Sequence, residues 1–129
     1  MPAPLRFVVH SLEHARAVLA AAAQAGRAVG LDSPPACAGF HGIGWWRALL
    51  SQAAAEHPGV AFDAVLDCGD APGHALAALR AGVTRLRVDV PAEVVDKLRA
   101  MGADLVPPSP ALDLASARDP LATARALLG

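Results

Sequence analysis

The stretch AVLDCGDAPGHALAALRAGVTRLRVDV, residues 64–90, decides the fold class. An apolar run ends in Asp67, Cys68 and Asp70, and a helical segment and a second apolar run follow it. A strand, a helix and a strand in this order favour a parallel sheet with a right-handed crossover. The stretch also raises a chemical question, because two carboxylates and a thiol end a buried run. They form either a reactive cluster or an ordinary strand-to-helix turn.

The same alternation of strand and helix patterns continues on both sides of this stretch. It predicts about five βα units in a single α/β domain spanning residues 1–129. Ser11 is placed to cap the first helix and Gly26 to end it, and Asp70 is placed to cap the helix that Pro72 enters. The expected strands are 5–9, 28–31, 62–66, 86–90 and 104–106, the expected helices are 12–25, 46–57, 72–81, 91–101 and a last one from Pro120, and residues 107–119 are expected to form a loop.

Two architectures fit this order of elements. One is a curved half of a TIM-type βα barrel, with strands in sequence order and the helices on one side; the alternative is a flavodoxin-like, doubly wound sheet. A doubly wound sheet buries both faces of its strands, yet Arg85 and Arg87 alternate with apolar residues, as do Asp63 and Asp67. This pattern favours the half barrel, and the same four side chains are spaced to pair across neighbouring strands.

Composition narrows the classes of function. The chain has a formal charge of −1 and no cluster of Lys and Arg, which argues against binding to nucleic acid or to an acidic membrane surface. It has no apolar run near the ~20 residues that span a bilayer, and its first residues do not resemble a signal peptide. Cys37 and Cys68 do not form a disulfide framework. We therefore expect a cytoplasmic protein.

In parallel α/β folds, sites lie where the carboxyl ends of the strands meet the amino ends of the helices, an edge that favours anions. The glycine-rich loop AGFHGIG, residues 38–44, lets backbone N–H groups approach a ligand there, although it matches no known phosphate-binding motif. The residues expected to bind a small anionic ligand at this edge are Asp32, Ser33, Gly42, Gly44, Cys68 and Asp89.

Residues 11–90 resemble the amino-terminal half of the class II, metal-dependent fructose- and tagatose-bisphosphate aldolases. The likeness lies in the order of SLEHARAVLAAAAQAG, AVGLDSPP, VLDCGD and ALRAGVTRLRVDV. It implies a TIM-type barrel, with Asp67 at the position of the catalytic acid/base and Cys68 where the family has a zinc-binding histidine. If zinc binds, His41 or His74 is the remaining candidate ligand. The family's later ligands have no counterpart, because no histidine follows His74.

Three functions remain open. The first is a non-catalytic or diverged aldolase-like domain that binds a small anionic ligand or a protein partner. The second is a metal-dependent lyase or isomerase that uses Asp67 and Cys68 on a phosphorylated or carboxylated compound. A receiver-like regulatory module ranks last, because His10-Ser11 stands where receivers carry an acidic pair. We also expect a homodimer, since a half barrel has open strand edges and Trp45 lies outside the core stripe of its helix.

Overall fold

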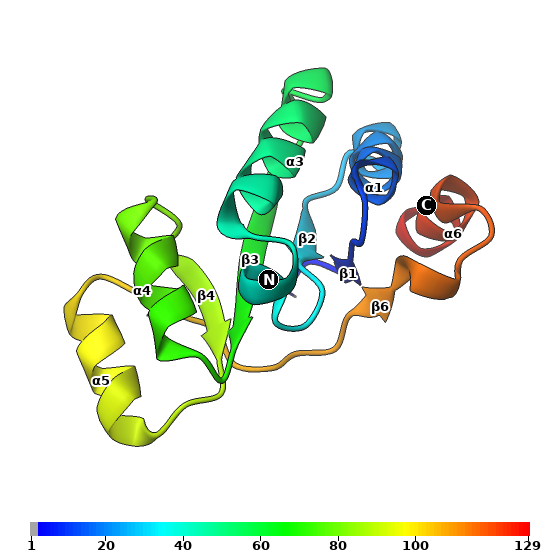
Figure 1. Cartoon of the computed structure of the whole chain (residues 1–129). Coiled ribbons are helices and arrows are strands. Elements are labelled where there is room, and N and C mark those ends of the chain that lie inside the picture. Colours follow the sequence, from blue (N-terminus) through cyan, green and yellow to red (C-terminus); the bar gives the residue numbers. More distant parts are fainter. Residues whose placement is uncertain (1–2) are drawn as a thin grey trace. The chain divides into compact units, whose positions relative to one another are not determined.

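The computed structural model, which describes residues 3–129, is an α/β fold with one parallel sheet of six strands (Figure 1). The strands are β1 (Arg6–Val8), β2 (Val29–Asp32), β3 (Phe62–Gly69), β4 (Arg85–Val88), β5 (Asp104–Leu105) and β6 (Leu112–Asp113). The helices are α1 (Leu12–Ala25), α2 (Cys37–Phe40), α3 (Ile43–Glu56), α4 (Pro72–Arg80), α5 (Ala92–Ala100) and α6 (Pro120–Leu128), with a 3-10 turn, η1, at Leu114–Ser116.

The strand order is β5-β4-β3-β2-β1-β6. The first five strands are therefore neighbours in sequence order, which confirms that prediction and differs from the flavodoxin-like order 2-1-3-4-5. The prediction of a loop over residues 107–119 was wrong at two points, because Leu112 and Asp113 pair with β1 as the parallel strand β6 and the 3-10 turn η1 follows at Leu114–Ser116. Two residues are too few to show an alternating pattern, and the prolines just before them pointed to a loop.

The chain divides by its contacts into two compact units. The first contains the described residues up to 32 together with 47–64 and 110–129, and the second contains 33–46 and 65–109. Strand β3 contributes its first residues to the first unit and its last residues to the second.

In the first unit, α1 packs against α6, and both helices carry a buried apolar side (Figure 1). Helix α1 begins and ends as the sequence predicts. The Ser11 side chain accepts a hydrogen bond from the His14 N–H, and Gly26 takes the left-handed conformation, φ 64°, that suits a helix end. From the β1 segment, Phe7 and Val9 are fully buried in the core of this unit.

The other face of β1 carries charge. The Nε and Nη2 atoms of Arg6 lie 2.9 and 2.6 Å from Oδ1 of Asp32, and its Nη1 atom binds Asp63. Gly30, opposite Arg6 in the neighbouring strand, leaves room for the guanidinium, since a Cβ atom there would lie 2.5 Å from Nη1. Asp63, one of the four charged residues that the sequence places on one face of the sheet, therefore binds Arg6 in this unit.

In the second unit, β4 pairs with the end of β3 and with β5, and α4 packs against α2 and α5. The core includes Leu66, Leu86 and Leu98. Arg85 pairs with Asp104 on β5, with Nη1 and Oδ2 2.6 Å apart. The prediction that Asp70 caps α4 was wrong, because the cap position is Ala71 and no side chain binds the first turn there.

Candidate functional site

The carboxyl end of β3 is held together by the side chain of Asp67. Its Oδ1 atom accepts hydrogen bonds from the backbone N–H of Ala36, at 3.1 Å, and of Gly69, at 2.8 Å. The Asp67 N–H in turn donates to Oγ of Ser33, at 2.9 Å. Asp67 therefore ties the segment before α2 to the end of β3, which is the work of a turn residue.

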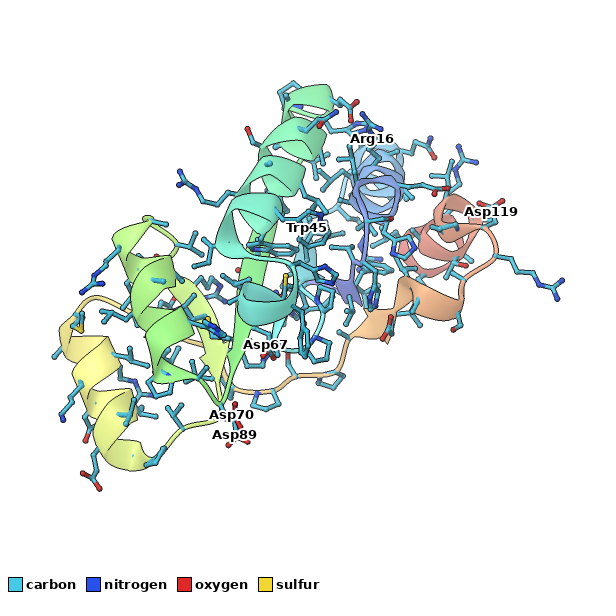
Figure 2. The ribbon with its side chains drawn as sticks, viewed as in Figure 1. Arg16, Trp45, Asp67, Asp70, Asp89 and Asp119 are labelled. Atoms are coloured by element: carbon cyan, nitrogen blue, oxygen red, sulfur yellow. The ribbon has the colours of Figure 1, made fainter. Side chains whose placement is uncertain are left out.

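The end of β3 also meets the end of β4. A register shift lies between Asp67 and Gly69, and the Asp89 N–H donates to the Gly69 carbonyl at 2.9 Å. Gly69 has φ 62°, a conformation that glycine adopts without strain. Figure 2 shows Asp70 and Asp89 at this same end of the two strands. The structure thus places Asp67, Cys68 and Asp89 at the carboxyl ends of neighbouring strands.

A pocket of about 320 Å³ opens beside this end of β3. Its walls come from α2, from the end of β3 and from the first turn of α4. Phe40 is the most exposed large apolar side chain of the described residues, at 83 %. The His74 ring lies against Gly39, where a Cβ atom would come within 2.6 Å of its Cε1 atom. The residues that line the pocket are Ala36, Gly39, Phe40, Cys68, Asp70, Ala71 and His74.

The two cysteines are buried and free. Burial raises the pKa of Cys68 to about 12, with further contributions from the nearby Asp67 and Cys37. Burial likewise raises the pKa of Cys37 to about 11, against a hydrogen bond with Ser33 that lowers it. Both thiols are therefore protonated near neutral pH, whereas a nucleophile must be a thiolate.

The predicted metal donors do not form a recognisable metal centre. Cys68 and His74 line the same pocket, but His41 stacks on Trp45 with ring centroids 4.6 Å apart. Within residues 3–129, no group of three or more His, Cys, Asp or Glu side chains is arranged to hold a metal ion. Because Cys68 is also only 1 % exposed, these residues do not fit the zinc that the aldolase resemblance implies.

The other predicted ligand-binding residues lie elsewhere. Asp32 is buried in the first unit and holds Arg6. Ser33 is buried and positions Asp67. Gly42, with φ 93°, directly precedes α3, and Gly44 lies in its first turn, so neither residue lines the pocket.

Gly39, in the glycine-rich loop at residues 38–44, lines the pocket, whereas sequence reasoning missed Ala36, Phe40 and Ala71 as pocket residues. Helix α2 is only one turn long, so it has no periodicity that would predict its position. An exposed phenylalanine beside glycine in the loop at residues 38–44 was the one available signal, because large apolar side chains in such loops often mark binding surfaces.

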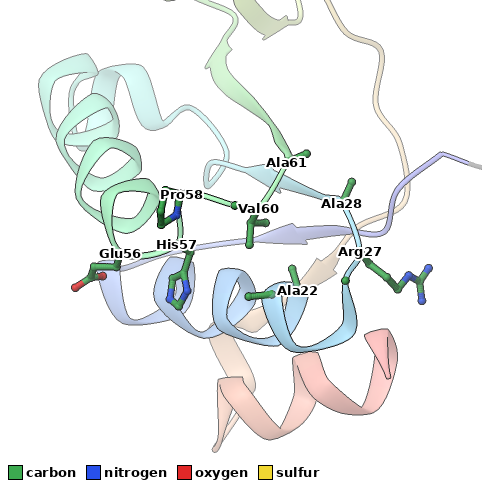
Figure 3. Close-up of a pocket in the computed structure, with 11 residues that line it drawn as sticks. Ala22, Arg27, Ala28, Glu56, His57, Pro58, Val60 and Ala61 are labelled. Carbon is green, nitrogen blue, oxygen red and sulfur yellow. The ribbon is translucent and has the colours of Figure 1, made fainter.

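A larger hollow, of about 500 Å³, lies in the first unit between the ends of α1 and α3 (Figure 3). Val60 and Ala61 line it just before β3, and Arg27 and Ala28 line it just before β2. The hollow is therefore at the amino ends of these strands. In parallel α/β folds, ligands bind at the opposite ends, so the smaller pocket is the better candidate site.

The chain matches no protein-family model and no curated protein sequence. Among helices within residues 3–129, none is both long and apolar enough to cross a membrane.

Proposed function

We propose that this chain is a non-catalytic, diverged aldolase-like domain that binds a small anionic ligand at the carboxyl end of β3. The observation that carries the proposal is the pocket between α2 and α4, which lies where ligands bind in parallel α/β folds. The sequential order of the first five strands supports descent from a βα barrel, because barrel strands follow one another in this way. A volume of about 320 Å³ suits a small ligand.

The groups around the pocket allow a ligand of low negative charge. The first turn of α4 has no side-chain cap. Pro72 has no N–H and the His74 N–H donates to the Ala71 carbonyl, so the Gly73 N–H is the group of this turn that would meet an acceptor at the positive end of the helix. The imidazole of His74 adds a second donor. Asp70 opposes an anion, which favours a carboxylate with one charge over a phosphate with two. Phe40 and Ala71 offer contact to an apolar part of the ligand.

The contacts of Asp67 and Cys68 weigh against the alternative of a lyase or isomerase. A general acid or base must reach the substrate, but Oδ1 of Asp67 already binds two backbone N–H groups. Cys68 is only 1 % exposed, and its thiol is protonated near neutral pH. Asp67 thus stabilises the turn at the end of β3, and Cys68 is a buried residue of the same turn.

Binding can be tested with two probes that differ in the sign of their charge, butyrate and butylammonium, with inorganic phosphate as a third. Amide shifts in a ¹⁵N-labelled sample report the site. We expect butyrate to shift the amides of residues 36–41 and 70–75 in a saturable way, and phosphate to bind more weakly. A stronger response to butylammonium would overturn the anionic part of the proposal, and no response to any probe would overturn the binding site.

Matched variants locate the ligand. Ala71→Leu fills the pocket and should abolish the butyrate response. Ala77→Leu, on the same helix but outside the pocket, should leave it unchanged. If both variants bind butyrate as the wild type does, the ligand sits elsewhere.

Assembly and location are part of the same proposal. Trp45 is half-buried and stacks on His41, and an aromatic side chain of this kind supports contact with a second copy or another protein partner. Sedimentation equilibrium at micromolar concentration should detect a homodimer that Trp45→Ala weakens; a monomeric wild type would refute it. The two free thiols fit a reducing cytoplasm.

A further inference from the structure

The backbone pairing between β6 and β1 is short. Only two residue pairs connect them, Phe7 with Leu112 and Val8 with Asp113. The Asp113 carboxylate adds two side-chain links through one oxygen. Its Oδ1 atom accepts from the Ala115 N–H at 2.8 Å, which starts η1, and lies 2.7 Å from Nε2 of His10. The contact between His10 and Asp113 therefore fastens the point where β6 becomes η1.

His10 is itself positioned by His14. The backbone N–H of His10 donates to Nδ1 of His14 at 3.0 Å, and the His14 N–H donates to Oγ of Ser11 at 3.1 Å. The two rings meet edge to face, with centroids 5.9 Å apart. Because Nδ1 of His14 is an acceptor, this ring must be neutral and carry its proton on Nε2. A protonated His14 has no acceptor nitrogen, so it cannot keep the bond to His10.

We propose that His10, His14 and Asp113 form a pH-sensitive clasp, closed while His14 is neutral, that fastens β6 and η1 to the end of β1. Protonation of His14 removes the acceptor that holds the His10 backbone. Loss of this bond loosens the turn that carries the His10 contact to Asp113, and the two-residue ladder of β6 is then left with little support.

The surrounding charges identify His14 as the switching group. Burial and the neighbouring His10 lower the pKa of His14, against Glu13 and Asp113, which raise it. Burial raises the pKa of Asp113, but hydrogen bonds from Ala115 and His10 outweigh this effect and lower it overall. Asp113 therefore stays ionised across the range in which histidines titrate.

The sign of the pH effect follows from the lowered pKa of His14. The unfolded chain binds a proton at this position more readily than the folded chain does. The stabilising contribution of neutral His14 is thus complete above the ordinary histidine value of 6.5 and is lost as the pH falls below it. The clasp opens on acidification.

Opening is confined to β6 and η1, because α6, which follows them in the chain, is held by hydrogen bonds that involve no histidine. Arg27 donates to the Leu128 carbonyl at 3.2 Å, and Nε of Arg125 donates to Oε1 of Gln24 at 2.7 Å. Ala124 and Leu128 remain buried on α6. Acidification would therefore uncover the edge of β1 while α6 stays in place.

Amide hydrogen exchange, expressed as protection factors to remove the intrinsic effect of pH, tests the clasp. Between pH 7.5 and 5.0, we expect amides of residues 112–117 to lose about threefold to tenfold protection, as for the loss of one net hydrogen bond. Amides in the middle of α3 should not change and serve as the internal reference. Constant protection at residues 112–117 would overturn the proposal.

Two substitutions separate titration from hydrogen bonding. His14→Asn keeps an acceptor near the position of Nδ1 but cannot be protonated in this range, so it should keep its protection at pH 5.0. His10→Gln keeps a donor near the position of Nε2 and should still lose protection on acidification, because His14 remains. A pH response in His14→Asn equal to that of the wild type would refute the role of His14.

The protonation state of His14 can also be measured in the wild-type protein, so this test does not depend on a variant that folds. The ¹⁵N shifts of the His14 ring report its tautomer directly. We expect the Nε2–H form at pH 7.5. The Nδ1–H form would be incompatible with the bond to His10 and would overturn the proposal.

Discussion

The carboxylate of Asp67 holds Ala36 in a left-handed conformation. Oδ1 of Asp67 accepts the Ala36 N–H at 3.1 Å, and Ala36 has φ 53° and ψ 29°. Within residues 3–129 it is the only residue other than glycine with a positive φ. This conformation costs an L-residue about 1–2 kcal/mol. The two N–H groups that Asp67 binds offset this cost, so the carboxylate and the strained turn form one unit.

Removal of this carboxylate should destabilise the fold. In Asp67→Ala, the Ala36 and Gly69 N–H groups both lose their acceptor, and we expect a loss of about 2–3 kcal/mol. Asp67→Asn keeps the Oδ1 acceptor and should lose less than half of that. Urea unfolding followed by circular dichroism measures both. Equal and small losses would show that Asp67 is free for another role, such as catalysis.

Substitution of Ala36 itself by glycine should not destabilise the fold, because its left-handed conformation is strained. Ala36→Gly removes the left-handed penalty but increases the entropy of the unfolded chain. The two effects leave a net change between zero and about 1 kcal/mol of stabilisation. Ala48→Gly, at an exposed site inside α3, is the matched control and should destabilise by about 1 kcal/mol. The same urea experiment compares them, and a loss at Ala36→Gly as large as at Ala48→Gly would contradict the assigned strain.

The order of strands and helices was predictable because each main element has a local signal. In α1, Ser11, Gly26 and the apolar stripe together specify the start, the end and the buried side, and the structure confirms all three. Elements of one turn or of two residues carry no such signal. Helix α2 depends on Asp67, which is 31 residues from Ala36 in sequence, so no local pattern could indicate it.

The site was predictable only in part, for a related reason. Parallel strands bring their carboxyl ends together, so Cys68 and Asp89 could be assigned to that region from topology. The direction of each side chain depends on long-range partners. Asp32, for example, points toward Arg6 and pairs with it. The contact between Asp113 and His10 was not predicted either, because the two residues are 103 positions apart in the sequence.

Arg6, whose side chain is largely buried, should contribute more to stability than an exposed arginine does. Its side chain is only 10 % exposed and contacts both Asp32 and Asp63. Arg6→Ala removes the guanidinium from the buried Asp32 and from the half-buried Asp63 and should cost about 3 kcal/mol. Arg16→Ala removes the exposed pair with Glu56 and should give no measurable loss. Thermal and urea unfolding test the contrast; similar small losses in both variants would show that Arg6 is not buried in solution.

The two thiols should be inert in the folded protein and should make it sensitive to alkali. Because burial raises the pKa of Cys37 to about 11 and of Cys68 to about 12, little thiolate exists at pH 8, and iodoacetamide should label both only after unfolding. A raised pKa means that the folded chain holds these protons more tightly than the unfolded chain does, so their contribution to stability is complete below the ordinary value of 9.0 and is lost as the pH rises above it. Urea unfolding at pH 8.0 and 10.0 should show this fall in the wild type and a smaller fall in Cys68→Ala. Rapid labelling of native Cys68 at pH 8, detected by mass spectrometry, would contradict the burial of the thiol and reopen the case for its reactivity.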